Sequence, residues 1–244
     1  MNGKIHSVFS GGTVDGPGIR FVVFMQGCPL RCKYCHNPDT WDLSGGEIRS
    51  DSDLVREIIK YKNYFGKTGG VTLSGGEPLV QIDFAIELLK KIKSYGIHTA
   101  VDTSGALFNL ESQEVLSKYE ELIKYTDLFL LDIKHIDDAS HKNLTGISNK
   151  NTLAFAKWLD QKGVKTWIRH VLVPNYTDDD ESLIKLGEFI KGLSNVEKVE
   201  VLPYHTMGEV KYNKLGFEYA LKGVKPPSKE SVLKAKQILG INKW

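Results

Sequence analysis

Short runs of β-branched and aromatic residues alternate along this chain with longer segments of helical periodicity. The predicted strands are about six residues long, and a polar loop follows each one before the next helical segment. We predict strands at 20–26, 71–73, 97–101, 128–131, 164–173 and 196–202. We predict helices at 53–64, 82–95, 111–125, 152–161, 181–193 and 229–239. The pattern therefore indicates six βα units.

This alternation predicts parallel strands joined by right-handed crossovers, and therefore an α/β protein. An open doubly wound sheet and part of a (β/α) barrel both fit the pattern. In either architecture the chemistry lies at the carboxyl ends of the strands. Arg169 interrupts the fifth predicted strand, and polar residues follow the other strands at Cys28, Ser74 to Glu77, Asp102, Thr103, Asp132, Lys134 and His205. We expect these side chains to meet at one rim.

Length and composition indicate an ordinary globular protein. We expect a single domain over 1–244, with an N-terminal strand or hairpin at 4–26 and a last helix near 229–239. The 41% hydrophobic share, 25% charged share and net charge of +2 are typical of soluble proteins. Lys and Arg are dispersed among Asp and Glu, so no nucleic-acid surface is predicted. No apolar run approaches the ~20 residues of a membrane helix and no secretory signal is visible, so we predict a cytoplasmic location.

Three cysteines, Cys28, Cys32 and Cys35, lie within eight residues of one another. An odd, clustered set does not build a disulfide framework, and in a reducing compartment it indicates a metal or redox centre. A 4Fe-4S cluster usually takes four thiolates, so three would leave one iron open to a small molecule. Zinc held by the three cysteines and His36 is the alternative. His36 directly adjoins Cys35, whereas zinc ligands are usually separated by two or more residues.

Several motifs resemble known families. The pattern Cys-x3-Cys-x2-Cys, with Tyr34 before the last cysteine, resembles the signature of the radical S-adenosylmethionine (radical SAM) superfamily. The segment 74–78, Ser-Gly-Gly-Glu-Pro, is similar to the glycine-rich turn of that superfamily. The segment 12–20, Gly-Thr-Val-Asp-Gly-Pro-Gly-Ile-Arg, resembles the signature of glycyl-radical-enzyme activases. Further agreement with activases of pyruvate formate-lyase lies at 34–37, 131–134, 167–169, 202–205 and 223–227.

This resemblance implies a partial (β/α)6 barrel of the radical SAM type. It implies that a 4Fe-4S cluster on Cys28, Cys32 and Cys35 is the catalytic centre and that S-adenosyl-L-methionine binds the open iron. Reductive cleavage would give methionine and a 5'-deoxyadenosyl radical, which abstracts hydrogen from a glycine Cα of pyruvate formate-lyase. The expected reductant is flavodoxin or ferredoxin, and the expected state is a monomer. No ferredoxin-like insertion with extra cysteines is present, so the minimal form is implied.

The resemblance also assigns roles to individual residues. It implies cofactor contacts from Tyr34, Cys35, His36, Gly75, Gly76, Glu77, Asp132, Ile133, Lys134 and His205. A monovalent cation would lie on Asp102, Thr103 and Asp132, and the substrate peptide would contact Asp15 and Arg169. Without the resemblance, each residue also fits a purely structural role. Tyr34 could pack in the core, Asp132 could cap a helix or turn, and Arg169 could form a structural ion pair.

Two alternative functions fit parts of the sequence. The nearer one is an activase of another glycyl-radical enzyme, such as the anaerobic ribonucleotide reductase, which would differ in the surface that meets the partner. The other, from a different class, is a non-catalytic zinc-binding or electron-transfer protein. Cleavage of S-adenosylmethionine by the reduced protein would exclude this second alternative.

Overall fold

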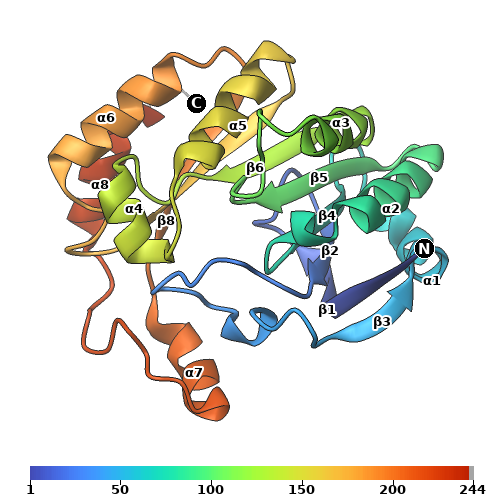
Figure 1. The fold of residues 1–244 in the computed structure, drawn as a ribbon, viewed down its shortest axis with the longest axis horizontal. Helices are drawn as coiled ribbons and strands as arrows, with labels where there is room; N and C mark the ends of the chain where they lie inside the picture. The colour runs from blue at the N-terminus through green and yellow to red at the C-terminus, as the bar shows by residue number, and fades with distance from the viewer. Residues whose placement is uncertain (242–244) are drawn as a thin grey trace. The chain divides into compact units, whose positions relative to one another are not determined.

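A computed structural model describes residues 1–241 (Figure 1). The chain forms two compact units, each described here by itself. The first unit comprises Met1–Pro29, Thr40–Thr103 and Leu107–Leu130. The second unit comprises Leu30–Asp39, Ser104–Ala106 and the chain from Leu131 onward. The segment with the three cysteines is divided between them, because Cys28 belongs to the first unit and Cys32 and Cys35 belong to the second.

The first unit is built on strands β1 (Asn2–Gly12), β2 (Arg20–Met25), β3 (Glu47–Ser50), β4 (Gly70–Gly75) and β5 (His98–Thr103). β1 pairs antiparallel with both β2 and β3, whereas β2 and β4 pair in parallel from Arg20↔Gly70 to Met25↔Gly75. β4 and β5 are also parallel. The carboxyl ends of β2, β4 and β5 therefore lie at one edge, as the sequence pattern predicts.

The helices of the first unit are α1 (Asp51–Ile58), α2 (Ile82–Ser94) and α3 (Gln113–Leu122). It also contains 3-10 turns at Ile59–Tyr64, Pro78–Gln81 and Ile123–Tyr125. A further 3-10 turn, Pro38–Thr40, begins in the second unit and ends in the first. α2 contacts both α1 and α3 (Figure 1). The buried side chains of α2 recur at helical spacing, at Phe84, Ala85, Leu88, Leu89 and Ile92. This apolar stripe provides the hydrophobic burial that stabilises the helix against the unit.

The second unit contains strands β7 (Thr166–Leu172) and β8 (Val196–Pro203), which pair in parallel. Its helices are α4 (Asp138–Thr145), α5 (Lys150–Gln161), α6 (Asp180–Lys191), α7 (Glu209–Leu215) and α8 (Lys229–Ile238), with a 3-10 turn at Thr206–Gly208. The sequence pattern does not predict α4, α7 or the strand β3. These elements are short, and α4 is marked mainly by its ends: Asp137 caps its first turn and Gly146 follows it with φ +87°.

Strand β6 (Leu128–Asp132) begins in the first unit and ends in the second. The sheet has the order β3-β1-β2-β4-β5-β6-β7-β8, in which β3 and β8 are the two end strands. The predicted α/β class is therefore confirmed, with an open and mostly parallel sheet. Within residues 1–241, no helix combines the length and the apolar character needed to cross a bilayer.

Candidate functional site

The turn after β4 approaches the end of β2 so closely that only glycine fits. Gly75 has φ +111°, and a Cβ there would lie 2.4 Å from the backbone nitrogen of Met25. A Cβ on Gly76 would lie 2.3 Å from the carbonyl oxygen of Gly27 and 3.2 Å from the Cβ of Cys28. The N–H of Gly76 donates to the carbonyl of Met25 at 3.0 Å. The predicted glycine turn therefore lies directly beside Cys28.

Four polar side chains lie at the carboxyl ends of β4 and β5. The hydroxyl of Ser74 donates to Asp102 Oδ2 at 2.8 Å, and the hydroxyl of Thr103 donates to Glu77 Oε1 at 2.6 Å. Glu77 is only 1% exposed, so the hydroxyl of Thr103 partly compensates a carboxylate that has little access to water. The first unit thus joins Ser74 to Asp102 and Glu77 to Thr103, and all four are among the polar residues that the sequence pattern puts after strands.

The loop that contains Asp15 is anchored on the same sheet. Thr72 on β4 donates through its hydroxyl to the carbonyl of Asp15 at 2.6 Å and accepts from Arg20 Nε at 2.9 Å. Thr72 and Ser74 are two residues apart on one strand, so their side chains share a face. Burial lowers the pKa of Arg20 to about 10, although Asp127 and Asp15 oppose this shift. The loop therefore lies against the face that carries Ser74.

In the second unit, the cysteine loop is held by α4 and by its own turn. The N–H groups of Arg31 and Lys33 donate to carbonyls in the last turn of α4 at 2.8 and 2.9 Å. The N–H of Cys35 donates to the carbonyl of Cys32 at 3.0 Å, and the N–H of Asn37 lies 3.4 Å from the sulfur of Cys35. Backbone contacts thus fix the positions of both cysteines.

Burial controls the protonation of Cys32. Desolvation raises the pKa of its thiol to about 12, and Cys35 and Asp132 add to this effect while Lys134 opposes it. Without a bound metal, the thiol of Cys32 therefore keeps its proton at neutral pH. Because thiolates are the form that binds iron, metal binding at this residue must release a proton.

Two buried polar atoms beside this loop lack a hydrogen-bond partner within the described part of the chain. They are the hydroxyl of Tyr34 and Nδ1 of His205. The ring of His205 stacks on that of His36, with the ring centroids 3.8 Å apart. Burial is the main cause that lowers the pKa of His36 to about 4, and the electrostatic effect of His205 is the second cause. An unpaired buried polar atom costs about 1–3 kcal/mol, so a ligand that satisfied either atom would gain free energy from it.

Asp132 and Lys134 form an ion pair at the end of β6. Lys134 Nζ lies 2.9 Å from Asp132 Oδ2 and 5.7 Å from the centroid of the Tyr34 ring. Burial would lower the pKa of Lys134, but Asp132 and Tyr34 raise it well above its usual value, so the ammonium stays charged. Ile133 is fully buried, and its N–H donates to the carbonyl of Arg169 at 3.0 Å.

Arg169 on β7 pairs with the neighbouring strand. Its Nε donates to Glu200 Oε2 at 3.0 Å, and Lys198 also contacts Glu200 at 2.7 Å. The structural ion pair considered from the sequence is therefore present, and it uses Nε of the guanidinium. Contact with a substrate peptide stays a prediction for this residue.

Sequence reasoning missed two residues that contact the cysteine loop, Lys211 and Tyr212. Lys211 Nζ binds Asn37 at 2.8 Å and Asp39 at 2.9 Å, and the hydroxyl of Tyr212 approaches the carbonyl of Cys32 at 3.5 Å. Both belong to α7, whose helical pattern is too short to predict. No three side chains of His, Cys, Asp or Glu in residues 1–241 are arranged to hold a single metal ion.

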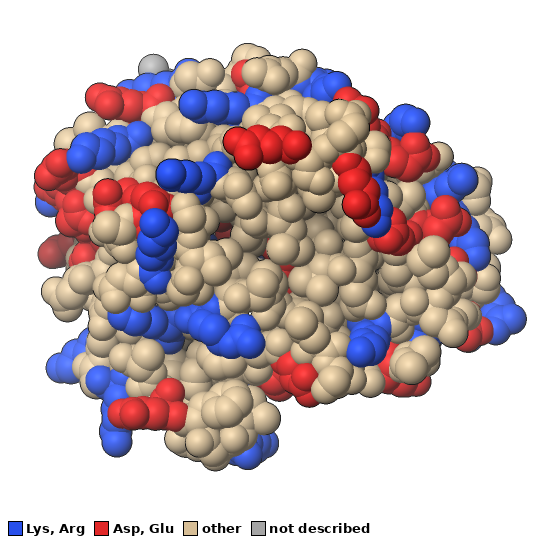
Figure 2. All heavy atoms as spheres, viewed as in Figure 1, with Lys and Arg blue, Asp and Glu red and all other residues tan. Residues whose placement is uncertain are grey.

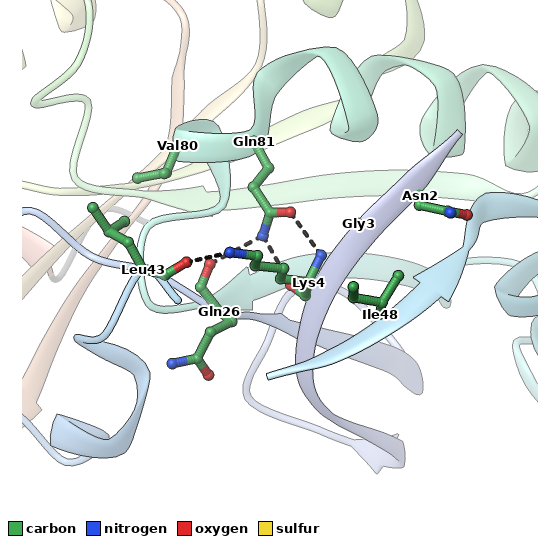
Figure 3. Close-up of a pocket in the computed structure, with 8 residues that line it drawn as sticks. All are labelled: Asn2, Gly3, Lys4, Gln26, Leu43, Ile48, Val80 and Gln81. Carbon is green, nitrogen blue, oxygen red and sulfur yellow. Dashed lines mark hydrogen bonds between the residues drawn. The ribbon is translucent and has the colours of Figure 1, made fainter. Parts of the chain in front are cut away.

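One pocket of about 410 Å³ lies in the first unit and contains no predicted site residue (Figure 3). The amide of Gln81 accepts from the N–H of Lys4 at 2.7 Å and donates to the carbonyls of Lys4 and Gln26 at 2.8 and 3.0 Å. These bonds tie β1 and the end of β2 to the segment that follows the glycine turn. The remaining lining residues are Asn2, Gly3, Leu43, Ile48 and Val80.

Comparisons with known proteins agree with this arrangement. The family model of the radical SAM superfamily matches residues 22–187. The pyruvate formate-lyase-activating enzyme of Streptococcus mutans is 52% identical over 241 residues, which cover 98% of this chain and 91% of that protein. The pyruvate formate-lyase 1-activating enzyme of Escherichia coli is 50% identical over 238 residues, which cover 97% of this chain and 95% of that protein.

A solved structure is also similar. The crystal structure of a domain of pyruvate-formate lyase-activating enzyme from Bacteroides vulgatus has a TM-score of 0.56 and 28% sequence identity. The match covers 70% of this chain and 93% of that domain. The chain therefore belongs to the radical SAM superfamily and, within it, to the family of the pyruvate formate-lyase-activating enzymes.

Proposed function

We propose that this protein activates pyruvate formate-lyase by generating a glycyl radical on it. The observation that carries this proposal is identity of about half the residues, over nearly the whole chain, to enzymes named for this activity. The reaction cleaves S-adenosyl-L-methionine reductively to methionine and a 5'-deoxyadenosyl radical. That radical takes a hydrogen atom from a glycine Cα of the partner, whose flanking amides delocalise the radical that results.

The cofactors of the radical SAM superfamily are a 4Fe-4S cluster and S-adenosyl-L-methionine. Cys28, Cys32 and Cys35 would hold the cluster, because three thiolates fit a cubane with one iron left for a small molecule. The partnerless polar atoms of Tyr34 and His205 fit a ligand bound beside the cysteines. When bound, the cluster supplies the electron that cleaves the sulfonium. The protein supplies the position and surroundings of the reacting groups.

The residues proposed to contact S-adenosyl-L-methionine offer it suitable hydrogen-bonding groups. The backbone of Gly75, Gly76 and Glu77 offers carbonyl oxygens to an ammonium group, and Glu77 is held in place by Thr103. The charged pair of Asp132 and Lys134 offers an acceptor to hydroxyl groups and a donor to a carboxylate. The other proposed contacts are Tyr34, Cys35, His36, Ile133 and His205.

A monovalent cation would bind Asp102, Thr103 and Asp132 beside the carboxylate of the cofactor. Carboxylate and hydroxyl oxygens are suitable ligands for a hard cation. Ser74 supports the proposal because its hydroxyl fixes Asp102 Oδ2 at 2.8 Å. A cation at this position would offset the negative charges that gather there.

Asp15 and Arg169 would bind the glycine loop of the partner. A primary carbon radical attacks almost any nearby C–H bond, so the target glycine must be held close and water kept away. The anchoring of the Asp15 loop on Thr72 and Arg20 supports this role, because it holds the loop in place before the partner arrives. Arg169 would offer guanidinium N–H donors to backbone carbonyls or a carboxylate of the bound peptide.

Several further features belong to this proposal. The reductant would be flavodoxin or ferredoxin, and the chain would work as a monomer with a single radical SAM domain over 1–244. The location would be the cytoplasm, where thiols such as those of the clustered cysteines stay reduced.

The test is anaerobic incubation of the reduced protein with S-adenosylmethionine and purified pyruvate formate-lyase. We expect a glycyl-radical doublet in the EPR spectrum, together with formation of 5'-deoxyadenosine. Omission of S-adenosylmethionine is the control. A doublet that forms only with anaerobic ribonucleotide reductase as the partner would contradict the proposal, as would failure to cleave S-adenosylmethionine at all.

A further inference from the structure

The helix α7 and the residues at its two ends, in the second unit, expose several large apolar side chains. Met207 is 76% exposed, Val210 59%, Leu215 42% and Phe217 48%. We call these four residues the α7 surface. Met207 and Val210 are three residues apart, which puts them on one side of the helix start. Such a concentration of exposed apolar residues marks an interaction site more often than a chance feature of the surface.

The inner side of the same helix contacts the cysteine loop. A Cβ on Gly208 would lie only 2.9 Å from the carbonyl oxygen of Cys35. The hydroxyl of Tyr212 reaches the carbonyl of Cys32, and Lys211 forms an ion pair with Asp39. A helix with its side chains is about 10–12 Å thick. A protein seated on the α7 surface would therefore be separated from Cys32 and Cys35 by a single helix.

Charge indicates the kind of partner. The segment 206–228 contains four lysines and two glutamates, and Lys214, Lys222 and Lys225 are exposed. The cysteine loop adds Arg31 and Lys33. In Figure 2 the surface at the position of α7 is largely tan, with blue and some red side chains at its border. An apolar surface with an excess of positive charge around it complements an acidic partner.

We propose that the α7 surface docks a small acidic electron-carrier protein. This inference rests on the proposed function. One electron leaves the reduced carrier, which becomes oxidised, and enters the cluster, which becomes reduced, with no bond made or broken. Proximity to the cluster ligands is what an electron donor needs, whereas pyruvate formate-lyase must bring its glycine to the 5' carbon of the cofactor. A small apolar surface with complementary charge is typical of transient redox encounters.

The experiment measures binding and reduction separately. Val210→Glu and Lys214→Glu each place a negative charge on or beside the α7 surface. Matched controls are Ile184→Glu on α6, where the side chain is 50% exposed, and Lys150→Glu at an exposed position of α5. The probe is an acidic flavodoxin, titrated calorimetrically against the cluster-loaded protein. We expect Val210→Glu to raise the Kd about tenfold, which is about 1.4 kcal/mol.

Kinetics provide the second readout. Both variants should slow cluster reduction by reduced flavodoxin but leave S-adenosylmethionine cleavage driven by dithionite at the wild-type rate. Added salt should weaken flavodoxin binding to the wild-type protein more than to Lys214→Glu. The two control variants should behave as wild type in every assay.

Three results would overturn the inference. The first is an unchanged Kd for flavodoxin in both Val210→Glu and Lys214→Glu. The second is no flavodoxin binding by the wild-type protein. The third is a loss of glycyl-radical formation in the variants that is equally large with flavodoxin and with dithionite as the reductant. The last result would assign the α7 surface to pyruvate formate-lyase instead. Failure of the proposed function is distinguishable, because the dithionite-driven wild-type protein would then produce no glycyl radical.

Discussion

Single residues in and beside the cysteine loop have properties that suit a bound metal or ligand. Cys32 is buried with its pKa raised to about 12, so its thiol is protonated and without charge. The hydroxyl of Tyr34 and Nδ1 of His205 are buried without partners in the described residues. Each of these groups would become more stable through metal coordination or a hydrogen bond. We therefore expect cofactor binding to stabilise the fold as well as to enable the reaction.

At this scale we predict that Cys32→Ala abolishes cluster binding and S-adenosylmethionine cleavage. Two thiolates leave the cubane with too few protein ligands, and the variant should therefore contain little iron after anaerobic reconstitution. Iron analysis, the visible absorption spectrum and the yield of 5'-deoxyadenosine measure the effect.

The fold of this variant should persist, because the loop is also held by backbone bonds from Arg31 and Lys33 to α4. Circular dichroism of the metal-free variant and of the metal-free wild-type protein is the control. Cleavage at the wild-type rate in Cys32→Ala would show that this cysteine is not a cluster ligand.

At the scale of elements, the site depends on how closely the ends of β2 and β4 approach each other. The backbone at Gly75 and Gly76 touches that of Met25 and Gly27, with no room for a side chain. The neighbouring strand β5 then supplies Asp102 and Thr103 to the residues that follow β4. Backbone contacts and side-chain hydrogen bonds therefore hold this edge of the first unit together.

We predict that Gly76→Ala lowers the free energy of unfolding by about 1–3 kcal/mol. The new Cβ would lie 2.3 Å from the carbonyl of Gly27, so the turn must move away from Cys28. Cluster loading should fall as well. Urea unfolding and iron content are the measurements.

Gly11→Ala on β1 is the matched control, since its Cβ would make only an ordinary contact of 3.5 Å with the ring of Phe9. This control should unfold at nearly the wild-type urea concentration. Equal stability of the two alanine variants would contradict the close approach at Gly76.

A second prediction at this scale concerns α4 and the pH dependence of stability. Burial is the main cause that lowers the pKa of His141 below its ordinary 6.5, and the same cause acts on His135 and His170. Below pH 6.5 the unfolded chain therefore binds more protons than the folded chain. The stability that neutral His141 provides is complete above this pH and is lost as the pH falls through the lowered pKa.

We expect His141→Gln to show a smaller loss of unfolding free energy than the wild-type protein between about pH 7 and pH 5. Urea unfolding of the metal-free protein at several pH values measures this loss. The nearby carboxylates Asp137, Asp138 and Asp179 have pKa values lowered below 3.8, so they titrate in a separate, more acidic range. Lys150→Gln serves as a surface control, and identical pH profiles for His141→Gln and wild type would refute the prediction.

At the scale of the whole molecule, the predicted residues are distributed over both compact units. The first unit contributes Cys28 and the glycine turn, and the second contributes Cys32, Cys35 and the charged pair at the end of β6. The proposed partner contacts are distributed in the same way, with Asp15 in the first unit and Arg169 in the second. The proposed assignments therefore draw on residues of both units.

At this scale we predict that Asp15→Asn separates cofactor cleavage from activation of the partner. The variant should keep its iron content and its S-adenosylmethionine cleavage, because the proposal assigns Asp15 to the partner peptide and not to the cluster or to S-adenosylmethionine. Its yield of glycyl radical on pyruvate formate-lyase should fall at least about tenfold, as expected for the loss of a charged hydrogen bond of about 1.5–3 kcal/mol.

EPR spin quantification and 5'-deoxyadenosine formation are measured in the same samples. Asp83→Asn, an exposed position at the start of α2, is the matched control and should activate the partner normally. A parallel fall of cleavage and glycyl radical in Asp15→Asn would place this carboxylate at the cofactor instead of the partner.

The sequence by itself determined the alternation of strands and helices, because residue types and their periodicity are local properties. The cysteine spacing also indicated a metal or redox centre, and the resemblance of the motif to the radical SAM signature assigned a 4Fe-4S cluster to it. Short elements such as β3, α4 and α7 could not be predicted, because a few residues carry too little periodicity. Their positions come from packing against the rest of the chain.

Only the tertiary structure decided which polar residues meet. The bond from Ser74 to Asp102, the pairing of Arg169 with Glu200, and the contact of Gly208 with Cys35 join residues that are distant in sequence. Burial was also a result of the fold: it raised the pKa of Cys32 and left the hydroxyl of Tyr34 without a hydrogen-bond partner among residues 1–241. The physical reason is that desolvation and hydrogen bonding depend on neighbours in space, which a linear sequence does not specify.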